Sequence, residues 1–274
     1  MRLSMIAGGL LLAACLPLAG CGGGDQAFLT AQRHEHGLVI ILPGIEGRGL
    51  LSEAIRDGLA AAEIDQAMPL YEWGWPVPLA GLVINQMDTA RARRQAARVA
   101  ALVAEYQDEH PGRPVHLVGH SGGAAVAVFA LEQLGEDRTV DGVILLAPSL
   151  STGYDLSKAL DRTCKGIANF WSPGDVALLV LGTTLLGNMD GVHGPAGGAV
   201  GFASPEDPGR AAKLHQLQWS LAMARSGHLG GHFTVTGGGF IQEWVAPWLL
   251  VRDWPAVTLP REQPTKQTQP AEGT

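Results

Sequence analysis

Val115-His116-Leu117-Val118-Gly119-His120-Ser121-Gly122-Gly123 is the stretch that decides the fold of this chain. Residues 115–118 predict a buried strand, and the alanine-rich segment after Gly123 predicts a helix that continues to residue 134. A sharp turn between strand and helix needs small residues two before and two after the serine at its apex. Gly119 and Gly123 meet that requirement. The stretch therefore predicts a strand, a strained turn and a helix, with the Ser121 hydroxyl presented at the turn.

The surrounding pattern carries this interpretation, since glycine makes up 37 of the 274 residues and a G-x-S-x-G match alone is weak. Apolar runs bounded by turn residues predict further strands, and a 3.6-residue apolar stripe with Asp88 as N-cap predicts a long helix. Such alternation is typical of a parallel sheet covered on both faces. We predict an α/β fold with a compact, mostly parallel sheet of about six strands. The predicted strands are 38–42, 115–119, 142–147, 166–171 and 214–219, with a possible strand near 67–71; the clear helices are 89–107, 122–134 and 240–250.

Charge and composition exclude some classes of function. A net charge of -7 gives no electrostatic reason to bind nucleic acid. The cationic residues between 91 and 98 lie on the long predicted helix and are interpreted as its solvated face. The length fits one catalytic domain, which we place at residues 37–254. Residues 255–274 are rich in Pro, Gln and Thr and predict a disordered tail.

The N-terminus has the pattern of an export signal. Arg2 precedes an apolar run too short to span a bilayer, and Leu18-Ala19-Gly20-Cys21 follows it. This block resembles the lipobox of bacterial lipoproteins, in which the cysteine is lipidated and becomes the mature N-terminus. The resemblance implies that residues 1–20 are removed, that acyl chains such as palmitate on Cys21 hold the protein in a membrane, and that residues 21–36 form a tether. An ordinary signal peptide is the alternative interpretation.

The residues next to Cys21 refine this expectation. Gly22, not Asp, follows the cysteine, which by resemblance to Gram-negative lipoproteins favours the outer membrane within the bacterial cell envelope. After lipidation of Cys21 and loss of Cys15, Cys164 would be the one cysteine left, without partners for a disulfide or a metal site. We expect Cys164 to pack in the core.

Backbone N–H groups around Ser121 predict an oxyanion hole. The helix after the turn begins beside the serine, and free N–H groups at a helix N-terminus favour negative charge. Gly122 N–H is therefore the first expected donor. The second is expected from the loop Leu42-Pro43-Gly44-Ile45-Glu46-Gly47, with Ile45 N–H preferred and Glu46 N–H as the alternative. The other interpretation of this loop is a glycine-rich turn without a chemical role.

A serine hydroxyl needs a base, and the base needs an orienting carboxylate. Asp175 is the preferred acid because it lies in a tight turn directly after a predicted strand. Asp155 and Asp190 are the alternatives. Asp155 is more simply explained as the residue that opens a short helix. His232 is the preferred base because flanking glycines free its backbone, and the other downstream histidines are His193, His215 and His228.

Two of these histidines need a further comment. His228 is the alternative base, since it too lies between the last strand and the final helix. Its spacing of four from His232 raises the possibility of zinc, but Gly230 and Gly231 oppose a helix between them and no Glu follows His228. We therefore predict no metal and no cofactor. His215 is expected to pack within a strand, and His193 to lie in a loop.

The blocks LPGIEG, GHSGG, SPGD and GGHF, taken together, resemble bacterial α/β-hydrolases of the lipase/esterase-like group. The resemblance covers residues 37–254 and implies a triad of Ser121, Asp175 and His232 with a two-donor oxyanion hole. It implies a serine hydrolase that cleaves a small-molecule or lipid acyl ester through an acyl-enzyme, as a carboxylesterase or lipase does. Thioesterases and peptidases would use the same residues.

The chain also departs from the pattern of that group. Pro43 replaces the histidine of the H-G-x-G motif, and the stretch between Asp175 and His232 is long. The glycine-rich residues 182–201 within it could form a flap over the site or a surface excursion. A surface lipoprotein that keeps the fold and binds without catalysis is the alternative from another functional class. The sequence does not decide the oligomeric state.

Overall fold

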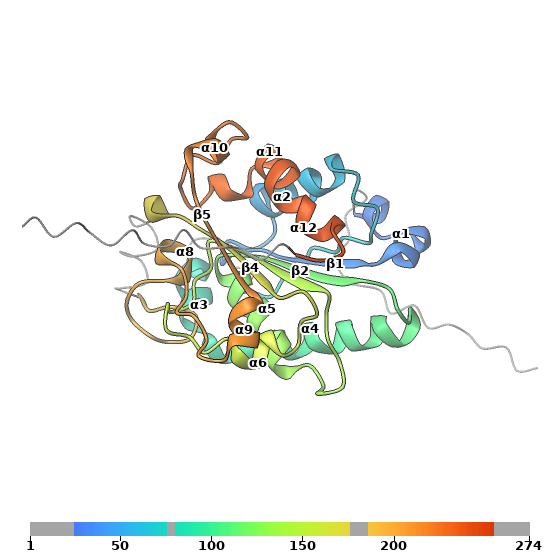
Figure 1. Ribbon diagram of the computed structural model, residues 1–274, viewed down its shortest axis with the longest axis horizontal. Coiled ribbons are helices and arrows are strands. Elements are labelled where there is room, and N and C mark those ends of the chain that lie inside the picture. The colour runs from blue at the N-terminus through green and yellow to red at the C-terminus, as the bar shows by residue number, and fades with distance from the viewer. Residues whose placement is uncertain (1–24, 76–79, 176–185, 255–274) are drawn as a thin grey trace, which may run out of the picture.

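A computed structural model describes residues 25–75, 80–175 and 186–254 (Figure 1). Several expectations from the sequence fall on other residues. The signal peptide, the lipidation site Cys21 and the tail 255–274 lie outside the described residues, as do residues 182–185 of the glycine-rich segment.

A five-stranded parallel sheet forms the centre of the described chain, in the order β1-β2-β3-β4-β5. Its strands begin and end within one residue of the predicted ranges, because each apolar run ends at a turn former or a helix start. Register pairs Leu42 with Gly119 and His120 with Leu146, so the strands end at one edge. The strands are β1 (Leu38–Leu42), β2 (Val115–His120), β3 (Gly142–Leu146), β4 (Ile167–Trp171) and β5 (Leu214–Gln218).

The possible strand near residues 67–71 forms isolated parallel bridges, Leu38 with Ala67 and Ile41 with Leu70. These bridges lie on the side of β1 opposite to β2. After β1, the chain first pairs along one edge of this strand at residues 67–70. It then crosses to the other edge of β1, where β2 pairs. In open α/β sheets, sites form at the carboxyl ends of strands where the winding reverses in this way. That point lies between β1 and β2, directly below Ser121 and the loop after β1.

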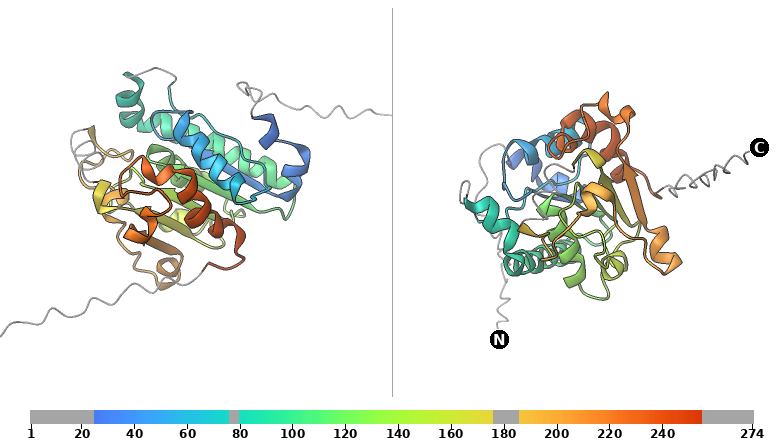
Figure 2. Two further views of the ribbon diagram at one scale, coloured as in Figure 1. Left: turned by 90° about the horizontal axis from the view of Figure 1, so that it is seen from above. Right: turned by 90° about the vertical axis from the view of Figure 1, so that its left-hand side faces the viewer.

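Helices cover both faces of the sheet, as predicted (Figure 1). Helices α4 and α5 lie on one face, and α2 packs with the C-terminal helices on the other (Figure 2). The side chains of β1 alternate between two separate cores: Leu38, Ile40 and Leu42 face α4 and α5, whereas Val39 and Ile41 face α2. Burial on both sides explains why β1 has no polar residue.

The clear helices occur where the sequence predicts them. Asp88 caps α4 by accepting a 2.9 Å hydrogen bond from Arg91 N–H. The C-terminal helix is continuous but contains a π-helical turn, η5 (Ile241–Val245). With η5, the helices given for the described part of the chain are η1 (Gln26–Phe28), α1 (Ala31–His36), α2 (Leu50–Ala61), α3 (Ala80–Met87), α4 (Thr89–Glu109), α5 (Gly122–Gln133), α6 (Ser157–Leu160), η2 (Pro173–Asp175), α8 (Gly197–Val200), α9 (Pro208–Ala212), α10 (Leu221–Ala224), η4 (Thr234–Thr236), α11 (Gly238–Phe240) and α12 (Ala246–Leu250).

Residues 25–36 differ from the tether predicted for them, because they fold against the domain. Asp25 is buried and forms ion pairs with Arg48 and Arg56. At the end of this segment, Tyr106 Oη donates a 2.6 Å hydrogen bond to the carbonyl of His34. These contacts join residues far apart in sequence, so local composition could not predict them.

Cys164 also differs from expectation. Its side chain is exposed and lies 3.2 Å from the hydroxyl of Thr139, so it does not pack in the core. It occupies a turn just before β4, where apolar burial begins only at Ile167.

Candidate active site

Ser121 lies at the turn between β2 and α5 with φ 52° and ψ -119°. The left-handed region costs a residue with a Cβ atom of the order of 1–3 kcal/mol, so the surrounding structure must enforce it. Ser121 N–H donates to the carbonyl of Leu146, and Ser121 O accepts from Ala124 N–H and Ser149 N–H. The turn thus holds the hydroxyl at the carboxyl edge of the sheet.

The two glycines of the turn are required for different reasons. A Cβ on Gly119 would lie 2.5 Å from Ala124 Cα, across the turn as expected from the sequence. A Cβ on Gly123 would instead lie 2.2 Å from the carbonyl oxygens of Leu42 and Pro43. Gly123 therefore lets α5 approach the loop after β1, which brings the two expected oxyanion donors together.

The structure brings the three predicted triad side chains together. His232 Nε2 lies 2.9 Å from Ser121 Oγ, and His232 Nδ1 lies 2.8 Å from Asp175 Oδ2. All three residues are buried. Asp175 ends η2, directly after β4, and His232 comes from the loop before η4. An acid, a base and a hydroxyl in this series can transfer a proton from serine to histidine.

The alternative base and acids lie elsewhere. His228 Nδ1 lies 3.1 Å from the hydroxyl of Thr234, and its ring packs edge-on against Phe240. Burial lowers the pKa of His228 to about 4, so it remains neutral in the core. Asp155 accepts from Ser157 N–H at 2.9 Å and opens α6. Asp190 hydrogen-bonds Ser151.

The other two histidines stand apart from the triad. His215 packs in β5, with its ring against those of Trp248 and Trp254. His193 lies close to Gly187, where an added Cβ would be 3.5 Å from His193 Nε2. The described part of the glycine-rich segment packs on the strand ends: Met189 N–H donates to Ser149 O, and Ser172 N–H donates to Gly198 O.

Side chains that the sequence did not single out clamp the loop after β1. Trp73 Nε1–H donates to Pro43 O at 2.7 Å, and Asn85 Nδ2–H donates to Ile45 O at 2.9 Å. A Cβ on Gly122 would lie 2.9 Å from Ile45 Cγ2, so Ile45 sits directly against the start of α5. Fixing a peptide carbonyl also fixes the adjoining N–H groups. No local pattern in the sequence points to Asn85, since its partner Ile45 lies 40 positions away.

Burial changes the proton affinity of the acid and the base. It lowers the pKa of His232 below the ordinary 6.5, although the hydrogen bond to Asp175 opposes this shift. Burial raises the pKa of Asp175, against the hydrogen bond and the attraction of His232. A lowered pKa keeps the His232 ring neutral at neutral pH, so that Nε2 is free to accept a proton.

Helix α3 has its polar side chains facing the site and its apolar side chains facing solvent. Asn85 and Gln86 are buried, and Gln86 Nε2 donates to Ser149 Oγ at 2.9 Å and to Gly187 O at 2.8 Å. The exposed large apolar residues of this helix are Leu82, Val83, Ile84 and Met87. Phe233, next to the predicted base, is 52% exposed and its ring lies 5.5 Å from that of His232. The ring of Phe233 therefore places apolar surface beside His232, whereas the apolar side chains of α3 point away from the site.

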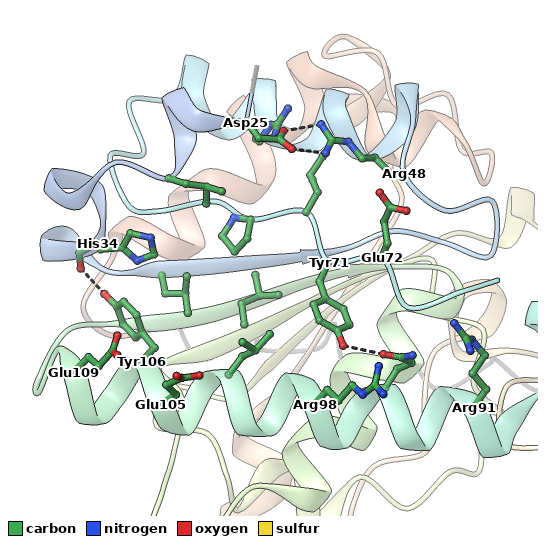
Figure 3. A pocket seen from close by; sticks show the side chains of 18 residues that line it. Asp25, His34, Arg48, Tyr71, Glu72, Arg91, Arg98, Glu105, Tyr106 and Glu109 are labelled. Atoms are coloured by element: carbon green, nitrogen blue, oxygen red, sulfur yellow. Dashed lines mark hydrogen bonds and ion pairs between the residues drawn. The ribbon is translucent and has the colours of Figure 1, made fainter. Parts of the chain in front are cut away.

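A separate cavity of about 530 Å³ lies between α4 and the N-terminal elements (Figure 3). None of the three triad residues lines it. Tyr71 Oη donates a 2.8 Å hydrogen bond to Gln95 in its wall, and both acidic and basic side chains line it. Its mixed charge points to no particular ligand. Among the described residues, no cluster of His, Cys, Asp or Glu could hold a metal ion. Within the same residues, no helix is long and apolar enough to cross a membrane.

Comparison with known proteins gives a family model and a set of solved structures. The family described as Serine aminopeptidase, S33, matches residues 86–184, a range that includes Ser121 and Asp175. No curated protein sequence matches the chain. Similar solved structures include esterase PE8, with TM-score 0.43 and 19% identity over 72% of this chain and 85% of that one.

Two further structures are a lipase and a cutinase. Aspergillus fumigatus lipase B has TM-score 0.48 and 13% identity over 76% of this chain, which spans 51% of the lipase. Trichoderma reesei cutinase has TM-score 0.38 and 13% identity, over 78% of this chain and 76% of that one. This chain therefore spans about half the length of that lipase and most of that cutinase.

Proposed function

We propose that this chain is a serine hydrolase of the α/β-hydrolase type that cleaves acyl esters through an acyl-enzyme. The contact that carries the proposal is His232 Nε2 at 2.9 Å from Ser121 Oγ, with Asp175 bound on the far side of the ring. Nucleophile, base and orienting acid are the parts that acyl transfer requires. A cofactor is not needed for this chemistry.

In the proposed mechanism, His232 takes the proton of Ser121 as Oγ attacks the ester carbonyl. Asp175 accepts a hydrogen bond from His232 Nδ1–H and stabilises the imidazolium that forms. The N–H groups of Gly122 and Ile45 donate to the oxyanion. The imidazolium then protonates the leaving alcohol as the acyl-enzyme forms. Water, deprotonated by His232, then attacks the acyl-enzyme. The His232 imidazolium returns that proton to Ser121 Oγ as the acid is released.

An apolar acyl group is the proposed substrate feature. The exposed ring of Phe233 beside His232 supports it, because burying apolar surface favours binding by about 25 cal/mol per Å². A carboxylesterase or a lipase fits this surface. A panel of p-nitrophenyl esters with graded acyl chains tests the preference, and kcat/KM should rise with chain length from acetate upward.

Labelling by a fluorophosphonate probe tests the nucleophile. We expect labelling of the wild-type protein and none of Ser121→Ala, with Ser149→Ala as the matched control that keeps labelling. Equal labelling of Ser121→Ala, or none of the wild type, would contradict the proposal. The second result would favour the alternative of a binding protein without catalysis.

Peptide amides are the second candidate substrate, because the matched family is described as a serine aminopeptidase. Such a substrate would bring an α-amino group that needs an acidic partner. Aminoacyl p-nitroanilides, compared with the p-nitrophenyl esters, separate the two. Turnover of the anilides at a rate similar to that of the esters would favour the peptidase.

We propose in addition that lipid on Cys21 anchors the protein in the bacterial envelope, more specifically in the outer membrane. The block Leu18-Ala19-Gly20-Cys21 supports this proposal. Asp25, only four residues later, is buried and ion-paired, and four extended residues reach at most about 14 Å. The catalytic domain would then lie close to the membrane. A Cys21→Ser variant should leave the membrane fraction, and unchanged fractionation would contradict the anchor.

A further inference from the structure

His120 and Glu46 face each other beside the triad and are not used by the mechanism above. His120 Nδ1 lies 3.5 Å from Glu46 Oε1, and the ring of His120 lies 4.9 Å from the ring of His232. The His120 side chain is wholly buried, and that of Glu46 is 29% exposed. Titratable groups are rarely buried next to a reacting centre without a partner or a role.

His120 makes one hydrogen bond, through Nε2, and one ionic contact, through Nδ1, which makes no hydrogen bond to the described residues. His120 Nε2 is 3.1 Å from the main-chain carbonyl of His232, and a carbonyl oxygen can only accept. Nε2 must therefore carry a hydrogen. Nδ1 then faces the Glu46 carboxylate, and this contact is attractive only if Nδ1 carries a hydrogen too.

Glu46 is held in the ionised form by its surroundings. Burial alone would raise its pKa, but hydrogen bonding and attraction from His120, its own backbone N–H and the nearby His232 outweigh burial and lower the pKa. The carboxylate also folds back over its own loop, since a Cβ on Gly44 would lie 2.3 Å from Glu46 Oε2. Glycine at position 44 leaves the room that this contact needs.

We propose that Glu46 and His120 form a charged pair that positions the reacting groups, an inference that rests on the proposed serine hydrolase function. Through Glu46, the pair holds the loop that presents Ile45 N–H. Through the hydrogen bond from His120 to the His232 carbonyl, it holds the loop that carries the base. The pair thereby links the oxyanion donor, the end of β2 and the base in a single arrangement.

The pair has an electrostatic purpose as well. Glu46 directly follows Ile45, the proposed donor, and its carboxylate lies 3.5 Å from the His120 ring, which packs against the ring of His232. An uncompensated carboxylate there would raise the energy of the transition state, because like charges repel strongly in a partly desolvated site. His120 supplies the compensating positive charge. The two residues therefore act as a unit. Replacing His120 alone would leave the charge of Glu46 uncompensated and raise the energy of the transition state.

The test measures kcat and KM for a short p-nitrophenyl ester in four proteins: wild type, Glu46→Gln, His120→Gln and the double variant. The glutamine of His120→Gln can still donate to the His232 carbonyl but leaves Glu46 without a cationic partner. We expect kcat to fall about ten-fold to a hundred-fold in His120→Gln and less in Glu46→Gln, with KM changed little. Adding Glu46→Gln to His120→Gln should recover part of that loss.

Recovery in the double variant is the result that a merely structural role would not produce. Two independent packing defects multiply, whereas removal of both charges restores neutrality. Glu132→Gln is the matched control, because Glu132 is also a partly buried acid, paired with Arg93 at 3.2 Å and Tyr154 at 2.5 Å, at the far end of α5. It should leave kcat unchanged. Thermal unfolding by circular dichroism shows that each variant is folded.

The outcomes separate this inference from the proposed function. Active wild-type enzyme with both single variants within about two-fold of it, or a double variant that loses the product of the single losses, would overturn the inference alone. A wild-type protein that hydrolyses no ester and takes no fluorophosphonate would overturn the proposed function, and the inference with it.

Discussion

Asn85 Nδ2–H donates a 2.9 Å hydrogen bond to the carbonyl of Ile45, while Asn85 Oδ1 accepts from Trp75 N–H at 2.7 Å. One buried amide thus joins α3 to the loop after β1. Because Ile45 N–H is the proposed second oxyanion donor, the position of α3 and the geometry of the oxyanion hole depend on each other.

Asn85→Leu should therefore lower kcat for a p-nitrophenyl ester by about ten-fold, since small misplacements of catalytic groups are costly. KM should change less. Gln242→Leu is the control, because it removes a similar amide-to-carbonyl bond, to Ala61 O at 3.0 Å, on the exposed side of the C-terminal helix. Equal effects of the two substitutions would contradict the link between α3 and the oxyanion hole.

Asp175→Asn should lower kcat roughly a thousand-fold or more, because an amide no longer holds His232 in the tautomer that accepts the serine proton. Steady-state kinetics with one ester measure the loss. Asp155→Asn and Asp190→Asn change the two alternative acids, which bind Ser157 and Ser151 away from His232. Both should retain full kcat. If either of them loses activity as Asp175→Asn does, the assignment of the acid is wrong.

The pH profile of kcat/KM should have an acid limb with its midpoint below 6.5. His232 acts as a base only when neutral, so activity is lost as the pH falls through its pKa, and burial lowers that pKa. The hydrogen bond and charge of Asp175 raise the His232 pKa, so residual activity of Asp175→Asn should show a limb at still lower pH. A wild-type midpoint above 6.5 would show that burial is not the dominant effect.

Gly123→Ala should destabilise the fold by about 1–3 kcal/mol or prevent it from forming, as overpacking against rigid atoms does. Its Cβ would lie 2.2 Å from two main-chain carbonyl oxygens, which cannot move independently of β1. Gly153→Ala is the matched control, with no heavy atom within 4 Å of the added Cβ. Urea unfolding compares the two. A Gly123→Ala protein as stable as the wild type would contradict the close approach of α5 to the loop.

The strands and the long helices could be predicted from the sequence because apolar residues recur in each of them with the local spacing that burial requires. Residues 38–42 are apolar throughout since both faces of β1 are covered, and Asp88 marks the start of α4 because its side chain caps the helix. The turn at Ser121 could be predicted for the same reason: strand, small residues and helix are neighbours in sequence. The exposure of Cys164 and the packing of residues 25–36 were not local and were missed.

The sequence by itself determined the α/β class, the edge of the sheet that carries Ser121, and which residue types could serve there. Only the tertiary structure decided between His232 and His228 as the neighbour of Ser121, because both lie in one loop and local spacing favours neither strongly. It alone brought Asn85 to Ile45 and Glu46 to His120. These contacts depend on how separate loops meet at the edge of the sheet. Contacts between segments far apart in the sequence produce no local pattern that could be recognised.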